Sequence, residues 1–247
     1  MFSSLWHLIN PRLCPMCGRV LYMDEDEICG FCVSKLPLTE HALRRDNSVE
    51  LTFADENKFV RGGAFCYYRH GEPFTEAVHA MKYGSRPEVG LALGRIAGHK
   101  WKDSGFFDDM DMIIPLPLHR KRLHDRGYNQ SEWIARGLCE TIGLPIVTDC
   151  LIRTVNNAQQ AFMSHEERRQ LSQIFEVHNE SAIRGKHILL VDDVMTTGST
   201  LRRAIHALHP IRRCTVSVFV LARAVNKKYA ADLKDEILHD DRVGFWV

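Results

Sequence analysis

The sequence has no long hydrophobic run. No stretch reaches about 18 consecutive apolar residues, so we expect no transmembrane helix. Residues 1–10 have neither the basic start nor the small-residue cleavage site of a signal peptide. An excess of charge is also missing, with 32 Lys and Arg against 31 Asp and Glu, which argues against a general nucleic-acid coat. We therefore expect a cytoplasmic protein, in which thiols stay reduced and clustered cysteines indicate metal ligands rather than disulfides.

The apolar residues within positions 1–10 fit one stripe of a short amphipathic helix. Packing against the protein's own core is the favoured interpretation. Contact with the inner membrane is the alternative, and it would place the protein at the membrane surface without a spanning segment.

Composition divides the chain into three stretches. Residues 1–36 hold four of the eight cysteines, residues 37–60 are polar and acidic and predict a linker or irregular lead-in, and residues 61–247 alternate apolar runs with helical patterns. This alternation predicts an α/β domain with a mostly parallel sheet flanked by helices. The expected strands are residues 64–68, 112–116, 145–148, 187–191 and 215–221. The expected helices are residues 73–83, 88–101, 131–142, 164–175 and 199–209.

Two cysteine pairs lie near the N-terminus. Cys14 and Cys17 form one C-x-x-C pair, and Cys29 and Cys32 form a second after eleven intervening residues. Each pair can offer two thiolates to one ion, and two pairs complete a tetrahedron of sulfur, which is typical of structural Zn²⁺. A redox pair of the thioredoxin type would need a single C-x-x-C beside a βαβ unit. The spacing therefore predicts a small zinc-ribbon-like module.

The most informative segment follows the strand expected at residues 187–191. Two carboxylates, Asp192 and Asp193, are followed by a hydroxyl-rich turn that opens a helix. The amides at a helix N-terminus favour a phosphate, and neighbouring carboxylates can accept hydrogen bonds from sugar hydroxyls. A glycine in the turn would let the backbone approach the ligand closely. The turn consists of Thr196, Thr197, Gly198, Ser199 and Thr200.

Other phosphate-binding loops are absent. The chain has no G-x-x-x-x-G-K-[ST] sequence and no G-x-G-x-x-G after an expected strand. The alternative is a purely structural role, in which a polar strand end is followed by a helix cap. The ordered combination of apolar strand, acidic pair and hydroxyl–glycine turn favours a sugar-phosphate site instead.

Residues 191–200 resemble the phosphoribosyl pyrophosphate (PRPP) signature of type I phosphoribosyltransferases. The paired C-x-x-C motifs narrow this resemblance to the ComF family, which includes the GntX-like proteins. The segments Lys82-Tyr-Gly84, Ile114-Pro-Leu-Pro117 and Arg126-Gly-Tyr-Asn-Gln-Ser131 point the same way. The resemblance implies the type I phosphoribosyltransferase fold.

The resemblance also implies roles for individual residues. Asp192 and Asp193 would bind the ribose hydroxyls, residues 196–200 would hold the 5′-phosphate, and Mg²⁺ would bridge ribose and pyrophosphate. Residues 153–168 would form a mobile loop that closes over the substrate. The positive charges expected near the pyrophosphate are Arg126, Arg120, Arg122 and Lys82. For the three arginines the alternative is a solvated basic face, and Lys82 could simply end a helix.

Three functions remain open for such a protein. It could transfer the phosphoribosyl group of PRPP to an acceptor that the sequence does not identify. It could bind PRPP or a nucleotide without turnover. ComF proteins are also associated with DNA uptake in natural competence, so it could contact single-stranded DNA or a competence protein.

Overall fold

The computed structural model describes residues 11–155 and 174–225. Its main sheet has four strands in the order β1-β6-β5-β2, and all three pairings are parallel. These strands are β1 (Phe59–Tyr68), β2 (Met112–Pro115), β5 (His187–Met195) and β6 (Thr215–Ala224). A separate antiparallel pair joins β3 (Leu151–Arg153) to β4 (Phe175–Val177). The predicted mostly parallel sheet is therefore confirmed.

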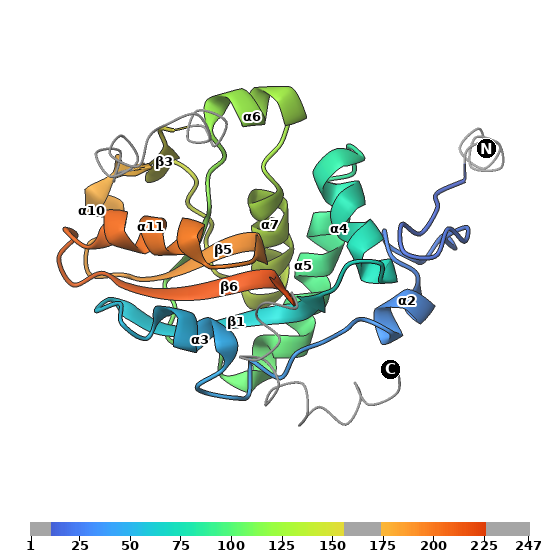
Figure 1. The fold of residues 1–247 in the computed structure, drawn as a ribbon, viewed down its shortest axis with the longest axis horizontal. Coiled ribbons are helices and arrows are strands. Elements are labelled where there is room, and N and C mark those ends of the chain that lie inside the picture. Colours follow the sequence, from blue (N-terminus) through green and yellow to red (C-terminus); the bar gives the residue numbers. More distant parts are fainter. Residues whose placement is uncertain (1–10, 156–173, 226–247) are drawn as a thin grey trace.

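Helices cover both faces of the sheet (Figure 1). Side chains of β5 explain why: Leu189 and Val191 join one buried cluster, while Ile188 and Leu190 join the other. A continuous apolar strand must be covered on two sides. The first cluster includes α4 (Pro73–Tyr83), α5 (Glu88–Trp101) and α7 (Gln130–Ile142), and the second includes α3 (Ser48–Phe53) and α11 (Ser199–Leu208). The remaining helices are α2 (Gly30–Ser34), the 3-10 turn η1 (Lys102–Ser104), α6 (Arg120–Arg126) and α10 (Glu180–Ile183).

Most of the expected elements are present. Four of the five strands are confirmed, and the helices expected at 73–83 and 88–101 have those bounds. The strand expected at 145–148 is wrong, because only Ile146 forms a bridge, to Ile113 of β2. Pro145 has no amide hydrogen to donate, which limits further pairing. In the helix expected at 164–175, residues 164–173 lie outside the described residues, and Phe175 begins strand β4 instead.

Part of the expected lead-in is ordered structure. Within residues 37–60, Asn47 caps helix α3 by accepting hydrogen bonds from the amides of Val49 and Glu50. Val49 and Phe53 lie one turn apart and are fully buried against the sheet. A six-residue helix with two core positions gives too short a periodic pattern to recognise in the sequence.

The N-terminal segment packs against the body of the protein. Its Cys14, Met16 and Leu21 belong to the same buried cluster as residues of α4 and α5. Within the described residues, no helix combines the length and apolar character needed to cross a bilayer.

Candidate functional site

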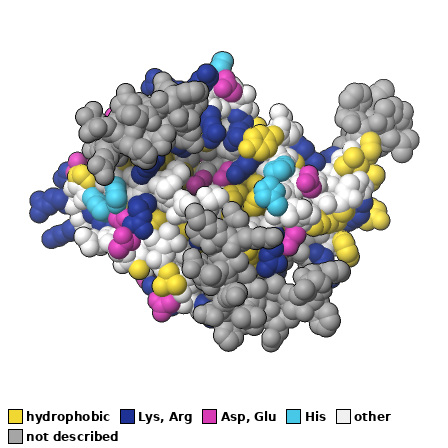
Figure 2. Space-filling model, viewed as in Figure 1, with side chains coloured by type: hydrophobic (Ala, Val, Ile, Leu, Met, Phe, Trp, Pro, Cys, Tyr) yellow, Lys and Arg dark blue, Asp and Glu magenta, His cyan; other side chains and the backbone are white. Residues whose placement is uncertain are grey.

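A cavity of about 170 Å³ opens at the carboxyl-terminal edge of the sheet. Its walls come from α4, α6, α7, α11, β3, β5 and the loop after β2. Figure 2 shows acidic side chains at the bottom of a hollow in this face, with Lys and Arg side chains beside them. A second cavity, beside His41 and Tyr67, is only about 30 Å³ and has room for about one or two waters. The larger cavity is therefore the candidate site.

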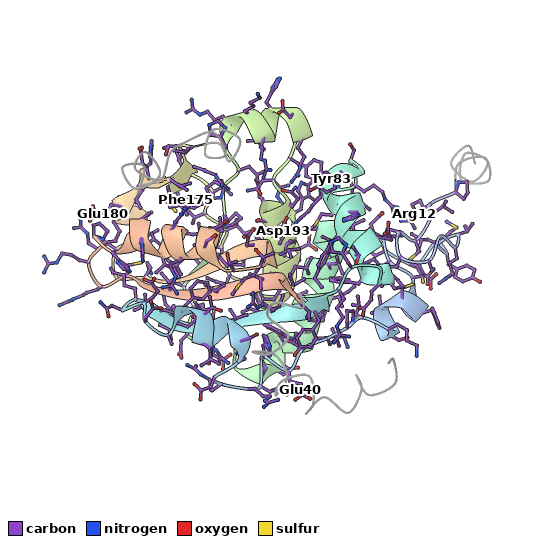
Figure 3. All side chains as sticks on the ribbon, in the orientation of Figure 1. Arg12, Glu40, Tyr83, Phe175, Glu180 and Asp193 are labelled. Carbon is purple, nitrogen blue, oxygen red and sulfur yellow. The ribbon has the colours of Figure 1, made fainter. Side chains whose placement is uncertain are left out.

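The acidic pair lies at the floor of this cavity. Asp192 and Asp193 both line it, and they belong to β5 itself, which runs four residues further than the predicted strand end at 191. Asp193 forms an ion pair with Lys82, with 3.0 Å between Oδ2 and Nζ. Figure 3 shows Asp193 and the neighbouring Tyr83 at this edge of the sheet.

Asp192 has a different environment. The Ser131 hydroxyl donates a hydrogen bond to Asp192 Oδ1 at 3.0 Å, and the Asp193 amide donates to the same oxygen at 2.9 Å. Burial and the adjacent charge of Asp193 raise the pKa of Asp192 to about 7. This carboxyl group therefore titrates near neutral pH.

The hydroxyl-rich turn begins helix α11 at the cavity. Thr200 lines the cavity, whereas Thr196, Thr197 and Ser199 are exposed at the turn. The amide of Ser199 donates only a long hydrogen bond, 3.4 Å, to the Thr197 hydroxyl. The helix N-terminus is thus accessible, as a phosphate site requires.

Gly198 also has a structural role that the sequence analysis did not predict. Its φ is +74°, and a Cβ at this position would lie 2.9 Å from Thr52 and 3.0 Å from Phe53. Glycine is therefore required here by the backbone conformation and by the close packing of α3.

Three of the four predicted cations line the cavity. Lys82 at the end of α4, and Arg122 and Arg126 on α6, do so, but Arg120 does not. The Arg126 guanidinium also lies 5.5 Å from the centre of the exposed Tyr83 ring. Residues 120–126 form a helix that the sequence did not predict, and Arg120, its first residue, is not part of the cavity lining.

The segment 126–131 connects the basic helix α6 to α7. Gly127 ends α6 with φ +83°, and the Tyr128 hydroxyl donates to the Met81 carbonyl of α4 at 2.6 Å. Asn129 caps α7 and donates from Nδ2 to the Leu116 carbonyl at 3.0 Å. These contacts fix α6 and the loop after β2 beside the acidic pair.

Three cavity residues were missed by sequence reasoning. Ser131 and Gln130 lie in the motif from which only Arg126 was chosen, and Arg153 was assigned to the mobile loop. Arg153 ends strand β3 and is nine-tenths buried, and burial lowers its pKa. Gln130 is 1% exposed, and its amide nitrogen has no hydrogen-bond partner among the described residues. This donor is therefore available to a water molecule or a ligand in the cavity. Residues 156–168 of the expected loop lie outside the described residues.

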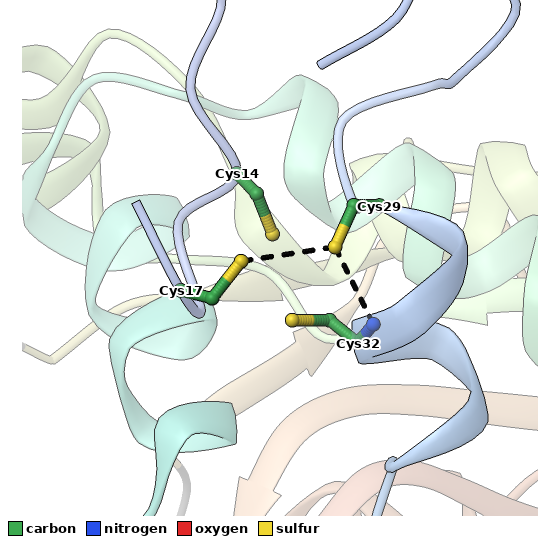
Figure 4. A group of neighbouring side chains, drawn as sticks. All are labelled: Cys14, Cys17, Cys29 and Cys32. Atoms are coloured by element: carbon green, nitrogen blue, oxygen red, sulfur yellow. Dashed lines mark hydrogen bonds between the residues drawn. The ribbon is translucent and has the colours of Figure 1, made fainter. Parts of the chain in front are cut away.

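The four cysteines of the N-terminal segment form a second candidate site. Their sulfur atoms lie within 4.8 Å of one another and point inward (Figure 4). The Sγ atoms of Cys17 and Cys29 are 3.7 Å apart, which matches the edge of about 3.8 Å in a tetrahedron with ~2.3 Å metal–sulfur bonds. Cys14, Cys29 and Cys32 are buried and Cys17 is exposed. This cluster can hold a structural metal ion.

The other cysteines are separate from this cluster. Cys66, Cys150 and Cys214 are buried, and burial raises the pKa of each thiol. Cys139 is half-buried on α7. These side chains fill the core, as expected for small apolar residues.

Comparison with known proteins agrees with this arrangement. The family described as "Phosphoribosyl transferase domain" matches residues 127–246. The chain is 29% identical to the DNA utilization protein YhgH of Escherichia coli O157:H7 over 222 residues, which cover 87% of this chain and 86% of that protein. It is 28% identical to the competence protein ComFC of Bacillus subtilis, over 87% of this chain and 80% of that protein.

The solved structures that resemble the chain are more distant. One is the glutamine PRPP amidotransferase from Bacillus subtilis complexed with ADP and GMP, with a TM-score of 0.42 and 21% identity over 58% of this chain and 30% of that chain. A likeness of this size has no bearing on the chemistry of the site. The sequence relatives and the four-cysteine cluster instead support the resemblance to the ComF family, and the chain has the type I phosphoribosyltransferase fold.

Proposed function

We propose that the protein binds PRPP in the cavity at the edge of the sheet and transfers its phosphoribosyl group to an acceptor, with release of pyrophosphate. The observation that carries this proposal is the convergence of three kinds of group in one cavity: the acidic pair of β5, the N-terminus of α11, and the cations Lys82, Arg122 and Arg126. A ribose that carries a 5′-monophosphate and a pyrophosphate has a partner for each of these three kinds of group.

Each group has a task in this proposal. The carboxylates of Asp192 and Asp193 accept hydrogen bonds from the ribose hydroxyls, and the amides of residues 197–200 meet the 5′-phosphate. Lys82 leaves Asp193 to meet the pyrophosphate together with Arg122 and Arg126. Their positive charges stabilise the leaving group as its bond to the sugar breaks. The acceptor supplies the nucleophile, so the chain needs no strong general base.

Magnesium is a suitable partner for this cavity. Asp192 and Asp193 are oxygen donors of the kind that Mg²⁺ uses together with substrate phosphates. When bound, Mg²⁺ would neutralise part of the charge of PRPP between ribose and pyrophosphate.

The test measures binding and turnover separately. Calorimetry with PRPP and Mg²⁺ should show saturable binding, lost in the double variant Asp192→Asn/Asp193→Asn. Pyrophosphate release in the presence of a panel of bases then distinguishes an enzyme from a binding module. Binding without release would remove the transferase activity and leave a PRPP sensor. Unchanged affinity in the folded double variant would remove the site itself.

We further propose that the four-cysteine cluster holds zinc. Four thiolates at tetrahedral spacing suit Zn²⁺ and leave no open coordination position, so the role of the ion is structural. Metal analysis of the purified protein should give one zinc per chain.

The names of the relatives support a link to DNA. They are called DNA utilization and competence proteins, and α6 presents three Arg and one Lys on an exposed helix. We propose that the protein serves DNA uptake through a competence protein or through single-stranded DNA. The near-zero net charge favours the protein partner.

Binding of fluorescent single-stranded DNA tests the direct contact. If α6 binds DNA, the affinity should fall steeply with salt and be lost when Arg120 and Lys121 are changed to Ala. The matched charge control is Lys100→Ala/Lys102→Ala, which removes two positive charges at the end of α5 and the start of η1. Binding that ignores salt, or that survives in the α6 variant, would contradict direct contact through this helix.

A further inference from the structure

A second group of side chains of metal-ligating types lies at the C-terminal end of α11. The hydroxyl-rich turn, residues 196–200, is at the other end of this helix. His206 is on the last turn of α11 and His209 follows directly after it, while Glu56 lies three residues beyond α3. The donor atoms of these three side chains lie within 4.8 Å of one another. His206 is about 10 Å along the helix axis from Ser199, so this group is separate from the cavity described above.

Both imidazoles point at the same carboxylate. His206 Nε2 is 2.9 Å from Glu56 Oε1, and His209 Nε2 is 3.2 Å from Glu56 Oε2. The two rings lie side by side, with centroids 5.0 Å apart. The Glu56 side chain is 4% exposed, whereas those of His206 and His209 are 54% and 37% exposed. An ion on this carboxylate would thus be held from below by the protein and open to solvent on the histidine side.

The neighbouring Arg202 has other partners besides Glu56. Arg202 contacts Glu56 Oε1, but its Nη1 also lies 2.8 Å from both carboxylate oxygens of Asp55, and its Nη2 donates to the Thr52 carbonyl. Arg202 therefore keeps an ion pair and a hydrogen bond if Glu56 turns its oxygen to a metal. Glu56 itself also stays in place, because its amide donates to the Phe53 carbonyl at 2.9 Å.

Two imidazole nitrogens and one carboxylate oxygen suit a divalent transition metal. Zn²⁺ binds these donors at about 2.0–2.2 Å and often uses three protein ligands with a fourth position open to water. At tetrahedral angles, such bonds place neighbouring donors about 3.4 Å apart. The observed 2.9 and 3.2 Å need to widen by only a few tenths of an ångström, which the exposed histidines can supply.

We propose that Glu56, His206 and His209 form a second metal site, which takes Zn²⁺ or a similar divalent transition ion. The ion joins the segment after α3 to the C-terminal end of α11. At the N-terminal end of α11, Gly198 packs against Thr52 and Phe53 of the same helix α3. The ion therefore links α3 to α11 at the end of α11 that is opposite the hydroxyl-rich turn.

The test is a titration of the untagged full-length protein at pH 7.5, after its four-cysteine site has been loaded. Zn²⁺ followed by calorimetry should show one further equivalent per chain, and the melting temperature should rise by roughly 5 °C. In the double variant His206→Gln/His209→Gln this equivalent and the rise in melting temperature should both disappear. The substitutions remove exposed side chains, so the fold should be retained.

The control is His99→Gln, which removes an exposed histidine from the last turn of α5. It should bind zinc as the wild type does. If the wild type takes up no further zinc, the three side chains form only hydrogen bonds and the proposal is wrong. A double variant that still binds the extra equivalent would place the ion elsewhere and contradict the proposal equally. Loss of PRPP binding has no bearing on either result, so the two proposals can fail separately.

Discussion

Asp192 and Asp193 are neighbours on β5, yet their electrostatic environments differ. Asp193 is balanced by the Lys82 ammonium at 3.0 Å. Asp192 is half-buried at the floor of the cavity, and its partner is the neutral hydroxyl of Ser131. Burial therefore disfavours its charged form, and the charge of Asp193 adds to this effect, while Lys82 opposes it. The two carboxylates therefore differ in how their charge is compensated: Asp193 has a cation beside it and Asp192 has a hydroxyl group.

The raised pKa of Asp192 predicts how stability depends on pH. An unfolded Asp has a pKa of about 3.9, and the folded value is about 7. Between these values the folded protein binds more protons than the unfolded chain, so the contribution of Asp192 to stability is present below pH ~4 and is lost as the pH rises through 7. We therefore compare the free energy of unfolding of the wild type with that of Asp192→Asn. Between pH 5 and pH 8 this difference should shift against the wild type by about 1–3 kcal/mol.

Urea unfolding of both proteins at pH 5 and pH 8 measures this difference. Asp149→Asn, which changes an exposed carboxylate, should run parallel to the wild type at both pH values. Parallel curves for Asp192→Asn as well would mean that Asp192 stays ionised in the folded protein.

At the scale of elements, α6 decides which basic residues reach the cavity. Helix periodicity separates residues that are adjacent in the sequence, so Arg122 and Arg126, four positions apart, share a face. Arg120 does not line the cavity. The hydrogen bond from Tyr128 to Met81 holds this helix beside α4.

Substitution of single arginines on α6 should distinguish those that line the cavity from the one that does not. Arg126→Ala removes a charge that we propose meets pyrophosphate, and PRPP affinity should fall about 10- to 100-fold, as for the loss of a charge-assisted hydrogen bond. Arg120→Ala, on the same helix, should change the affinity less than about twofold. Calorimetry with PRPP and Mg²⁺ measures both. Equal losses would indicate a diffuse electrostatic effect in place of a specific contact.

The turn between β5 and α11 is the second element on which the site depends. Gly198→Ala forces a side chain into a positive φ and against Thr52 and Phe53, so it should destabilise the protein by about 2–4 kcal/mol. Gly143→Ala has the same kind of φ, +75°, at the end of α7 but no atom within 4 Å of the new Cβ. It should cost only about 1 kcal/mol.

Denaturant unfolding of the two glycine variants separates backbone strain from packing. A similar loss in both would show that α3 moves aside to admit the methyl group. In that case α3 would not constrain the phosphate turn.

On the scale of the whole molecule, the cysteine module is joined to the rest of the chain through the turn after α4. Arg86 donates to the Leu13 carbonyl at 2.9 Å and pairs with Glu27 at 2.6 Å. Arg95 of α5 pairs with Asp26. Lys82, which lines the cavity, and Arg86, which contacts the module, are four residues apart in the sequence, so one segment contacts both.

Loss of the metal ion should therefore lower the stability of the core outside the module as well. Cys14→Ser should abolish stoichiometric zinc and lower the free energy of unfolding by about 3 kcal/mol, because the buried cluster around Met16 and Leu21 is shared with α4 and α5. Metal analysis and thermal unfolding check the two parts. Cys139→Ser, a half-buried cysteine away from the cluster, is the control and should keep its zinc. An unchanged zinc content in Cys14→Ser would contradict the four-sulfur centre.

The sequence alone determined those features whose parts are neighbours along the chain. Apolar runs predicted four strands of the parallel sheet, and helical periodicity predicted α4 and α5 with their bounds. The two C-x-x-C pairs predicted a cluster, because each pair already places two sulfurs together. The acidic pair and the turn that opens α11 were recognisable for the same reason: a strand, two carboxylates and a helix N-terminus follow one another directly.

Only the tertiary structure decided which distant residues meet. Ser131 reaches Asp192 across 61 residues, and His206 reaches Glu56 across 150. Strand order and the facing of α6 selected Lys82, Arg122 and Arg126, left Arg120 outside, and brought Gln130 and Arg153 into the wall. A local pattern records only which residues prefer a helix, a strand or a turn. The partners of a side chain depend on how those elements pack, and that packing is set by the whole core at once.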